Sequence, residues 1–322
     1  MAGSIAVPAM LALLLAMPWP GVAADPGSDA ATMLSRQPTT AGDGVRVVAV
    51  RELDERQVDL TIDSPAVGIQ DVRLLLPTRF HERPEARWPV LYLLHGCCSD
   101  HTSWTRWTDI EAMTAGRDVL VVMPDAGAWG WYSDWWNDGR GGPPMWETFH
   151  LEELLPLLER DWRAGDRRAV AGVSMGGFGA MSYAARHPGL FVAAASFSGM
   201  LQTQAPFFRP GEAIWGDRVE QRANWAAHDP VSLAPALRGV ALYVSYGSGD
   251  HAGRGRIVGD LEQWFAGVNE RWLVGGNQAF IDRLEGLGIP VTVDAGPGTH
   301  SWPYWERAMR RSLPLVLGAL GA

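Results

Sequence analysis

The stretch from Ala169 to Gly179 constrains the fold of this chain more than any other. It reads Ala-Val-Ala-Gly-Val-Ser-Met-Gly-Gly-Phe-Gly, so an apolar run ends at Gly172 and a helix-compatible run follows Ser174. A Gly-x-Ser-x-Gly sequence between a strand and a helix forms a turn so sharp that the serine takes a strained backbone conformation. Only glycine tolerates the close approach of strand and helix on either side. The stretch therefore predicts a buried strand, a tight turn at Ser174 and a helix over 175–186.

Length and composition are those of a folded chain with a large core. The sequence has 322 residues, of which 47% are hydrophobic and 20% charged. We interpret it as one α/β domain with insertions rather than two domains. The net charge of −9 argues against nucleic acid and against an anionic membrane surface as partners. Most of the 16 tryptophans are expected in the core, yet their number suggests a broad aromatic groove.

The N-terminal residues resemble an export signal. Ile5 to Met17 is mostly apolar, and Val22-Ala23-Ala24 offers small residues for cleavage, although no Lys or Arg precedes the apolar run. An uncleaved membrane anchor would need a longer run than this one, which prolines interrupt. We therefore predict a signal peptide at 1–24, a flexible leader at 25–44 and a single domain at 45–322. The expected location is secreted or cell envelope.

The pattern of apolar runs predicts the order of elements. Expected strands lie at 45–50, 57–62, 71–76, 88–94, 118–123, 167–171, 191–196, 240–246 and 290–295. Helices are expected at 146–162, 175–186, 257–287 with a break at Gly275-Gly276, and 302–317. The run from Trp88 to Leu94 is continuously apolar, as in a strand of a parallel sheet covered on both faces. Residues 202–236 are irregular and rich in Pro, Trp and Arg, which predicts an insertion over the edge of the sheet.

A serine at such a turn is a candidate nucleophile, and it needs a base to take its proton and an acid to orient that base. Ser174 precedes four histidines, at 187, 228, 251 and 300. Only His300 follows a late strand and leads into the final helix, so it is the expected base. His187 ends a helix beside a proline, and His228 precedes Asp229-Pro230, so structural roles are expected for both.

The acid is expected on a loop after a strand between the serine and the histidine. Asp250 lies directly after the strand at 240–246 and fits that place. Asp260 and Glu262, on the helix that follows, are the alternatives, and Asp294 lies within the last strand.

Two backbone amides are expected to stabilise an oxyanion beside the serine. The amide of Met175 stands at the start of the helix, and that of Cys97 lies in the loop His95-Gly96-Cys97-Cys98 after an early strand. The alternative for this loop is an ordinary strand-to-helix turn. Cys97 and Cys98 are the only cysteines, and adjacent residues do not easily meet disulfide geometry.

No cofactor and no metal are expected. Two neighbouring thiols make a zinc site improbable, and the sequence lacks His-Glu-x-x-His. The loop Gly247-Ser-Gly249-Asp-His-Ala252 fits a degenerate dinucleotide-phosphate pattern, but it comes late in the chain and no further βαβ unit follows it.

Together these motifs resemble the esterase family of α/β-hydrolases that includes the secreted mycolyltransferases, which move long acyl chains between trehalose lipids. The matching segments are Tyr132-Ser133-Asp134-Trp135, Trp146-Glu147-Thr148-Phe149, Gly172-Val-Ser174-Met175-Gly and Gly298-Thr-His300-Ser-Trp302-Pro-Tyr304-Trp305, within residues 88–308. The resemblance implies the α/β-hydrolase fold, a mainly parallel sheet with helices on both faces. It also implies Ser174 as nucleophile, His300 as base, and oxyanion amides at Cys97 and Met175. Asp134, Trp135 and Trp302, which lie in these segments, are the candidate substrate-binding residues.

The chain also departs from the mycolyltransferases. His95-Gly96-Cys97-Cys98 stands where they have an Asp-Gly-Leu-Arg type stretch that helps to hold trehalose. Their acid is a glutamate a few residues further along the chain than Asp250, whereas Asp250 fits the broader esterase pattern better. Gly176-Gly177 stands where small alanines often occur. These differences bear on the acceptor sugar rather than on the serine chemistry.

The hypothesis that follows is a secreted serine acyltransferase or esterase with a Ser-Asp-His triad and an acyl-serine intermediate. Its expected partners are a small-molecule or lipid acyl ester and a glycolipid, sugar or water acceptor. No nucleic acid, no partner protein and no integral membrane span are implied. The alternatives are a simple secreted carboxylesterase, a catalytically inactive glycolipid-binding relative, and a cytosolic thioesterase on the same fold.

Overall fold

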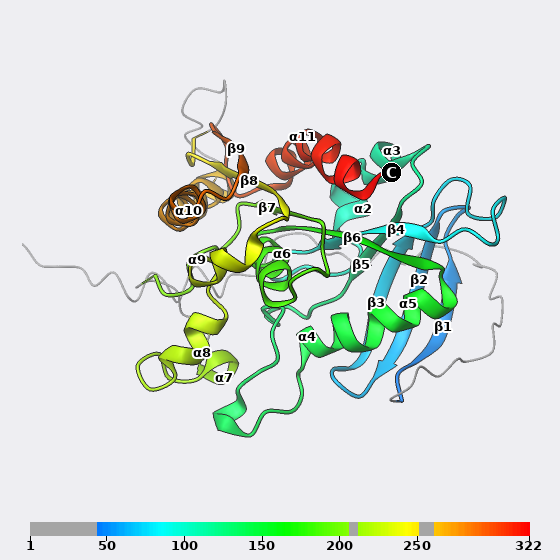
Figure 1. Ribbon diagram of the computed structural model, residues 1–322, viewed down its shortest axis with the longest axis horizontal. Helices are drawn as coiled ribbons and strands as arrows, with labels where there is room; N and C mark the ends of the chain where they lie inside the picture. Colours follow the sequence, from blue (N-terminus) through cyan, green and yellow to red (C-terminus); the bar gives the residue numbers. More distant parts are fainter. Residues whose placement is uncertain (1–43, 206–211, 251–260) are drawn as a thin grey trace, which may run out of the picture. The chain divides into compact units, whose positions relative to one another are not determined.

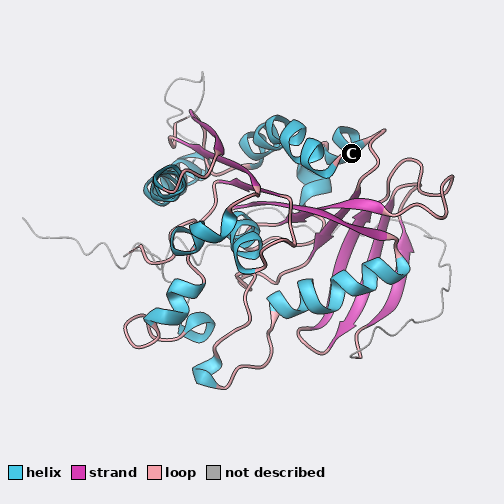
Figure 2. Cartoon of the chain, viewed as in Figure 1, coloured by secondary structure: helices cyan, strands magenta, loops and turns pink. Residues whose placement is uncertain are grey.

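A central sheet organises the chain in the computed structural model, which describes residues 44–205, 212–250 and 261–322. Within those residues nine strands form one sheet in the order β1-β2-β3-β5-β4-β6-β7-β8-β9 (Figures 1 and 2). The strands are β1 (Arg46–Glu52), β2 (Gln57–Ser64), β3 (Gly68–Leu75), β4 (Trp88–Leu94), β5 (Leu120–Pro124), β6 (Ala164–Val173), β7 (Ala193–Phe197), β8 (Ala241–Gly247) and β9 (Val291–Gly296).

The sheet has two parts that differ in strand direction. β1, β2 and β3 form an antiparallel meander, and β3 also runs antiparallel to β5. From β5 through β4, β6, β7 and β8 to β9 every pairing is parallel. The carboxyl ends of the parallel strands therefore meet at one edge of the sheet, where α/β folds place their functional loops.

The helices of the described chain lie between these strands and after them. They are α2 (Ser103–Trp107), α3 (Ile110–Thr114), α4 (Trp146–Thr148), α5 (Leu155–Asp161), α6 (Met175–Arg186), α7 (Glu212–Trp215), α8 (Arg222–Ala227), α9 (Pro230–Leu233), α10 (Leu261–Gly286) and α11 (Trp302–Leu320). A π-helical turn over Phe149–Leu154 joins α4 to α5, so 146–161 is one helical run. Short 3-10 turns cover Asn137–Gly139 and Ala234–Leu237.

Alternation along each parallel strand divides the core into two layers. In β4, Val90, Tyr92 and Leu94 pack in the layer that contains α6, α10 and the helical run 146–161. Leu91 and Leu93 pack on the other face, with α2, α3 and α11. Figure 1 shows this arrangement, with α11, α2 and α3 on one side of the parallel strands and α6 and α5 on the other. Both faces of the sheet are thus covered, which is why these strands are continuously apolar.

The sequence expectations agree with most of these elements. The strand predicted at 88–94 and the helix predicted at 175–186 coincide with β4 and α6, and the predicted insertion 202–236 contains α7, α8 and α9. The predicted break at Gly275-Gly276 is wrong, because α10 runs continuously through both glycines. Neither glycine has a positive φ, and a Cβ at Gly276 would lie 3.3 Å from Cβ of Gln202. Gly276 therefore serves a close contact with a neighbouring segment rather than a turn.

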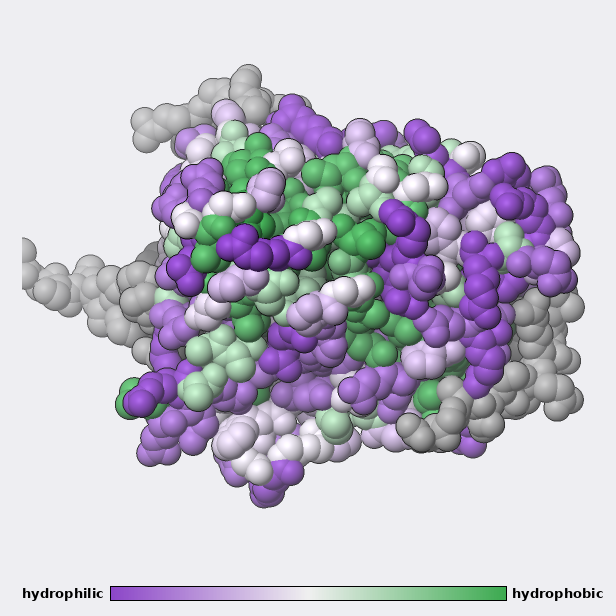
Figure 3. Space-filling model, viewed as in Figure 1, coloured by the Kyte–Doolittle hydropathy of each residue, from purple (hydrophilic) through white to green (hydrophobic). Residues whose placement is uncertain are grey.

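Large hydrophobic side chains are scattered over the surface of the described residues. Those most exposed include Ile69 on β3, Trp107 on α2, Val219 in the insertion and Trp264 on α10. On the face drawn in Figure 3, hydrophilic residues form most of the rim, and hydrophobic residues gather toward the middle. No helix among the described residues is long and apolar enough to cross a membrane. The predicted signal peptide and all but the last residue of the predicted leader lie outside the described residues.

Candidate active site

Ser174 occupies a strained turn between β6 and α6. Its backbone angles are φ 55° and ψ −117°, a conformation that costs a non-glycine residue free energy and persists only where the surroundings enforce it. A Cβ at Gly172 would lie 2.2 Å from the carbonyl oxygen of Gly176, and one at Gly176 would lie 2.3 Å from that of Leu94. Both glycines are therefore required by backbone contacts, as the Gly-x-Ser-x-Gly pattern predicts.

His300 lies 126 residues after Ser174 in the sequence and contacts it in the folded structure. Its Nε2 is 2.9 Å from Oγ of Ser174, in the loop between β9 and α11. Its ring packs edge-on against Trp305, with centroids 4.8 Å apart, and its backbone amide donates to the carbonyl of Ala266 on α10. The ring is thus held by α10 and α11, and the structure brings together the predicted nucleophile and base.

A buried glutamate, Glu270, completes the chain of hydrogen bonds. Nδ1 of His300 is 2.9 Å from Oε2 of Glu270, whose side chain is fully buried in the middle of α10. The other carboxylate oxygen, Oε1, accepts hydrogen bonds from Oγ of Ser198 at 2.7 Å and from the amide of Gly247 at 2.5 Å. Because an ionised carboxylate only accepts, Nδ1 carries the proton and Nε2 is left to accept from the Ser174 hydroxyl. Serine, imidazole and carboxylate therefore form one continuous relay.

The prediction of Asp250 as the acid is wrong in this geometry. Asp250 lies in the segment that follows β8, where its carboxylate accepts from Oγ of Ser248 and is exposed to solvent. Asp294 instead faces β8 and α11, accepting from the Tyr243 hydroxyl and from Arg311. Asp260 lies outside the described residues, and so does the side chain of Glu262.

One sequence signal could have indicated Glu270. The buried residues of α10 recur at helical spacing and form a stripe that faces the sheet: Ala266, Glu270, Leu273, Asn277, Phe280 and Leu284. A carboxylate inside such a stripe is costly to bury unless hydrogen bonds satisfy it. A helix break at Gly275-Gly276 would divide this stripe, whereas the continuous helix α10 keeps it on one face.

The loop after β4 packs directly on the nucleophile. A Cβ at Gly96 would lie 3.3 Å from Cβ of Ser174, so the loop and the turn are in contact there. His95 is fully buried: its Nδ1 lies 2.7 Å from the carbonyl oxygen of Gly96, and its Nε2 accepts from the amide of Ala126 at 2.9 Å. Nε2 also lies 3.3 Å from Oδ1 of Asp125. Since a peptide unit is planar and trans, holding the Gly96 carbonyl also fixes the direction of the Cys97 N–H.

The other predicted oxyanion amide is that of Met175, the first residue of α6. The first amides of a helix have no partner within it, so they are available to an anion, and the helix dipole favours negative charge there. The roles of Cys97 and Met175 in binding an oxyanion remain predictions.

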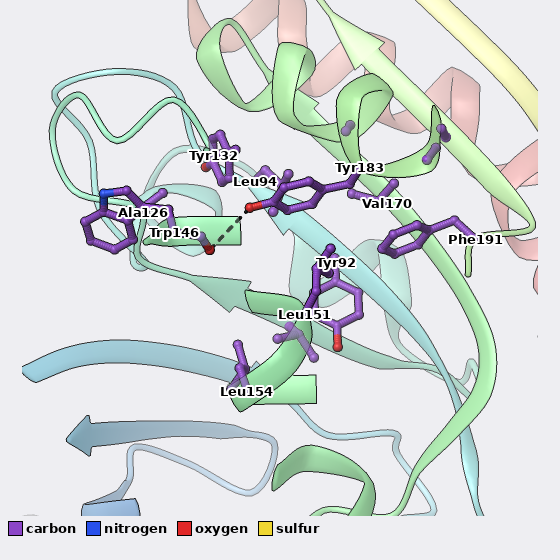
Figure 4. Packing of buried hydrophobic residues seen from close by; sticks show 14 of the residues in the cluster. Tyr92, Leu94, Ala126, Tyr132, Trp146, Leu151, Leu154, Val170, Tyr183 and Phe191 are labelled. Atoms are coloured by element: carbon purple, nitrogen blue, oxygen red, sulfur yellow. Dashed lines mark hydrogen bonds between the residues drawn. The ribbon is translucent and has the colours of Figure 1, made fainter. Parts of the chain in front are cut away.

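Tyr132 contacts both the loop after β4 and helix α6. Its hydroxyl donates to the carbonyl of His95 at 2.8 Å, and a Cβ at Gly179 on α6 would lie 2.5 Å from Cγ of its ring. Figure 4 shows Tyr132 near Tyr183, which projects from α6 toward the backbone oxygen of Trp146. The segment Tyr132-Ser133-Asp134-Trp135 thus supports the loop and the helix around the serine.

The candidate substrate-binding residues make mainly structural contacts. Asp134 accepts from the amide and the hydroxyl of Thr148, at 3.0 and 2.7 Å, and so holds the end of α4. The indole of Trp135 donates to the carbonyl of Gly130, and Trp302 packs edge-on between Trp104 and Trp305. Their contact with a substrate remains a prediction.

Most tryptophans of the described chain belong to the core rather than to a groove. Less than a tenth of the surface is exposed for a set of them: Trp88, Trp104, Trp131, Trp146, Trp162, Trp215, Trp225 and Trp305. The packing alternative therefore accounts for these residues. Likewise His187 pairs with buried Glu147 at 2.6 Å, and His228 is buried and stacks on Trp215, in agreement with the structural roles expected for both. The described residues contain no cluster of three or more His, Cys, Asp or Glu that could hold a metal ion.

The mainly parallel sheet, the strained serine and the histidine–carboxylate relay place this protein in the α/β-hydrolase class. A model of the Esterase family matches residues 69–316. Esterase Rv1288 of Mycobacterium tuberculosis is 34% identical over 278 residues, which cover 80% of this chain but 59% of the relative. The chain thus spans less than two thirds of that relative's length. The diacylglycerol acyltransferase/mycolyltransferase Ag85B of Mycolicibacterium smegmatis is 30% identical, over 81% of this chain and 85% of the relative.

Solved structures agree with the fold. A ferulic acid esterase superposes with a TM-score of 0.63 at 25% identity, covering 82% of this chain and 98% of that one. MPT51 of Mycobacterium tuberculosis, at 22% identity, superposes with a TM-score of 0.66 over 83% of this chain and 100% of its own, which bears on the fold alone. The chain belongs to the Esterase family.

Proposed function

We propose that this protein is a serine esterase or acyltransferase that uses Ser174 as nucleophile, His300 as general base and Glu270 as the acid that orients it. The observation that carries the proposal is the pair of 2.9 Å contacts that link Ser174 to His300 and His300 to Glu270. The strained serine at the start of a helix adds to it, because this turn exposes the hydroxyl above the sheet edge.

The reaction follows from these positions. Ser174 Oγ attacks the carbonyl carbon of an ester while His300 Nε2 takes the hydroxyl proton. The amides of Cys97 and Met175 donate to the oxyanion that forms, and each such donor contributes about 10²–10³ in rate. Collapse of the intermediate expels the alcohol, which receives the proton from His300 and leaves an acyl-serine. Glu270 stabilises the imidazolium and keeps its ring oriented without itself taking the proton.

The acyl-serine is then released by water or by another hydroxyl group. The same base activates either acceptor, so the relay serves hydrolysis and transfer equally. One relative is named an esterase and another a diacylglycerol acyltransferase/mycolyltransferase, and the two outcomes differ only in this second step. We place the reaction outside the cytoplasm, in the medium or the cell envelope, on the export-like sequence of residues 1–24.

The test is turnover and labelling of purified protein. Ser174→Ala should lower hydrolysis of a p-nitrophenyl acyl ester by at least about 10⁴-fold and should abolish labelling by a fluorophosphonate probe. Thermal unfolding controls for folding of the variant. Ester turnover that persists in the pure, folded variant would overturn the mechanism.

Product analysis then separates the two acceptors. A long-chain acyl ester is supplied with and without trehalose or glycerol, and the acylated products are compared with free fatty acid. Acylated acceptor that accumulates faster than free acid establishes a transferase. Free acid alone, with the acceptor ignored, establishes an esterase.

A further inference from the structure

Two buried residues outside the relay, Ser198 and Trp305, contact its acid and its base. Ser198 directly follows β7, and its Oγ lies 2.7 Å from Oε1 of Glu270. Trp305, in the first turn of α11, places its Nε1 3.0 Å from Oγ of Ser198. The same indole ring packs edge-on against His300. The four side chains therefore form a closed circuit of contacts.

The direction of the hydrogen bonds in this circuit follows from the chemistry of the groups. The Trp305 indole only donates, and an ionised Glu270 carboxylate only accepts. The Ser198 hydroxyl must therefore accept from the indole and donate to the carboxylate. The indole thus orients the hydroxyl toward Glu270.

The backbone at Ser198 is held in a conformation that is uncommon for a residue with a side chain. Its φ is 50°, and its amide donates to the carbonyl of Ser245 on β8 at 2.7 Å. Such a residue costs free energy and persists only where its surroundings enforce the conformation. Ser174 has the same feature, with a φ of 55°. Strained residues of this kind gather at functional sites, which directs attention to the Ser198 hydroxyl.

We propose that Ser198 and Trp305 are positioning residues that set the rotation of the Glu270 carboxylate against His300. This role rests on the function proposed above. Oε1 of Glu270 accepts from Ser198 and from the amide of Gly247, so Oε2 is the oxygen that faces Nδ1 of His300. Without the serine hydroxyl, a single donor holds Oε1, and the plane of the carboxylate is free to tilt away from the imidazole.

The circuit also connects helices from the two faces of the sheet. α10, which carries Glu270, packs in the layer that contains α6, and Trp305 of α11 packs in the other layer. Ser198 lies between them at the carboxyl end of β7 and bonds to both. A misplacement of about 1 Å in a catalytic group costs about 10²-fold in rate. The packing of α11 therefore bears on the acid as well as on the base.

Ser198→Ala tests the proposal, and Ser196→Ala is the matched control. Ser196 lies near the end of β7 and is also buried, but its hydroxyl has no hydrogen-bond partner among the residues that the structure describes. With the p-nitrophenyl acyl ester, kcat of Ser198→Ala should fall by about 10- to 10²-fold at unchanged KM, because a hydrogen bond to a charged group is lost. Ser196→Ala should stay within about twofold.

Denaturant unfolding shows whether each variant is folded. Ser198→Gly removes the same hydroxyl at a backbone angle that glycine adopts freely, so it takes the place of the alanine variant if that one does not fold. Undiminished kcat in a folded chain without the Ser198 hydroxyl, or a rise in KM alone, would overturn the proposal.

A second background shows whether Ser198 acts through Glu270. In the Glu270→Gln chain, Ser198→Ala should change kcat by less than about twofold, since the charge that the serine positions is already absent. A serine that only supports the fold would lower kcat by the same factor in both backgrounds. That result would also overturn the proposal.

Trp305→Phe separates the indole N–H from the packing of the ring. The variant keeps an aromatic ring beside His300 but removes the donor to Ser198. We expect kcat to fall by about fivefold in the wild-type chain, and by less than about twofold when Ser198 is already alanine. Equal losses in the two chains would contradict the link between indole and hydroxyl.

Fluorophosphonate labelling of the wild-type chain separates the positioning role from the function on which it rests. A wild-type chain that neither labels at Ser174 nor turns over ester contradicts the proposed function, and the positioning role falls with it. A wild-type chain that labels and turns over ester, beside an equally active Ser198→Ala variant, contradicts the positioning role alone.

Discussion

The turn at Ser174 and the hydrogen-bonded pair of His300 and Glu270 are positioned in opposite ways. Ser174 is positioned mainly by the residues beside it in sequence, because a Cβ at Gly172 would meet the backbone of Gly176 in α6, while one at Gly176 would meet the backbone at the end of β4. His300 and Glu270 are 30 residues apart, and each is 90 or more from the serine in sequence. They come from a loop and from the middle of a helix, and only packing of α10 and α11 brings them together. The nucleophile turn is thus a local structure, and the acid–base pair is a tertiary one.

The turn and the acid–base pair are stabilised by different interactions. The strain at Ser174 is maintained by tight backbone packing within and beside one strand–turn–helix unit. Burial of the Glu270 carboxylate is maintained instead by hydrogen bonds from Ser198, Gly247 and His300. Substitutions in the turn at Ser174 should therefore lower the stability of the fold. Substitutions of His300 or Glu270 should instead lower the rate of ester turnover.

The largest expected effect is on the acid. Glu270→Gln removes the negative charge that stabilises the imidazolium. The neutral amide also no longer fixes which ring nitrogen of His300 carries the proton, so kcat should fall by about 10³–10⁴-fold. Asp250→Asn is the matched control and should stay within about twofold, since among the described residues the exposed Asp250 carboxylate accepts a hydrogen bond only from Ser248. Steady-state kinetics on both variants decide between the two acids. Equal losses, or a larger loss for Asp250→Asn, would contradict the role of Glu270.

A substitution at Gly172, in the turn, should lower the free energy of unfolding. Gly172→Ala places a Cβ 2.2 Å from a backbone oxygen, so the free energy of unfolding should drop by about 3 kcal/mol or the variant should not fold. Gly318→Ala on α11 meets no atom within 4 Å and should be neutral or stabilising by up to about 1 kcal/mol. Denaturant unfolding compares the two. A Gly172→Ala variant as stable as wild type would mean that the turn is not held by these contacts.

A smaller effect on kcat is expected for His95, in the loop after β4 beside the turn. His95→Ala frees the carbonyl of Gly96 and leaves the amide of Ala126 without its acceptor. We expect kcat to fall by about 10²-fold with little change in KM, because the oxyanion amide loses its orientation. His81→Ala, an exposed histidine, serves as control. A rise in KM alone would assign His95 to substrate binding instead.

The smallest expected effect is a dependence of stability on pH. Burial lowers the pKa of His150 and of His228 from 6.5 to about 4. Between these values the unfolded chain binds protons that the folded chain does not, so stability is lost as the pH falls from 6.5 toward 4. Each histidine should account for about 2 kcal/mol by pH 5.

The variant His228→Gln should remove about half of that loss, measured by denaturant unfolding at several pH values. Both histidines pack on the side of the sheet that carries α6, so the measurement also reports whether that side limits stability in acid. An unchanged slope in the variant would show that His228 is accessible to protons in the folded state.

The sequence alone was enough to predict the strained turn at Ser174 and most of the fold. Continuous apolar runs predict β4 and its neighbours, because strands covered on both faces leave no polar position. The strand–turn–helix at Ser174 is predicted because its constraints are carried by glycines within a few residues. His300 is predicted from its place after the last strand.

Only the tertiary structure decided which carboxylate meets His300. Asp250 has the expected place in the order of elements, yet its side chain ends in solvent, whereas Glu270 reaches the imidazole from a buried stripe of α10. The choice depends on the rotation and depth of that helix against β8, which are set by long-range packing. The same holds for the tryptophans, which composition could assign to a groove or to the core and which the packed structure places mainly in the core. Local sequence specifies a turn because its constraints are short-range, but the partner of a side chain across the fold is specified only once the layers have packed.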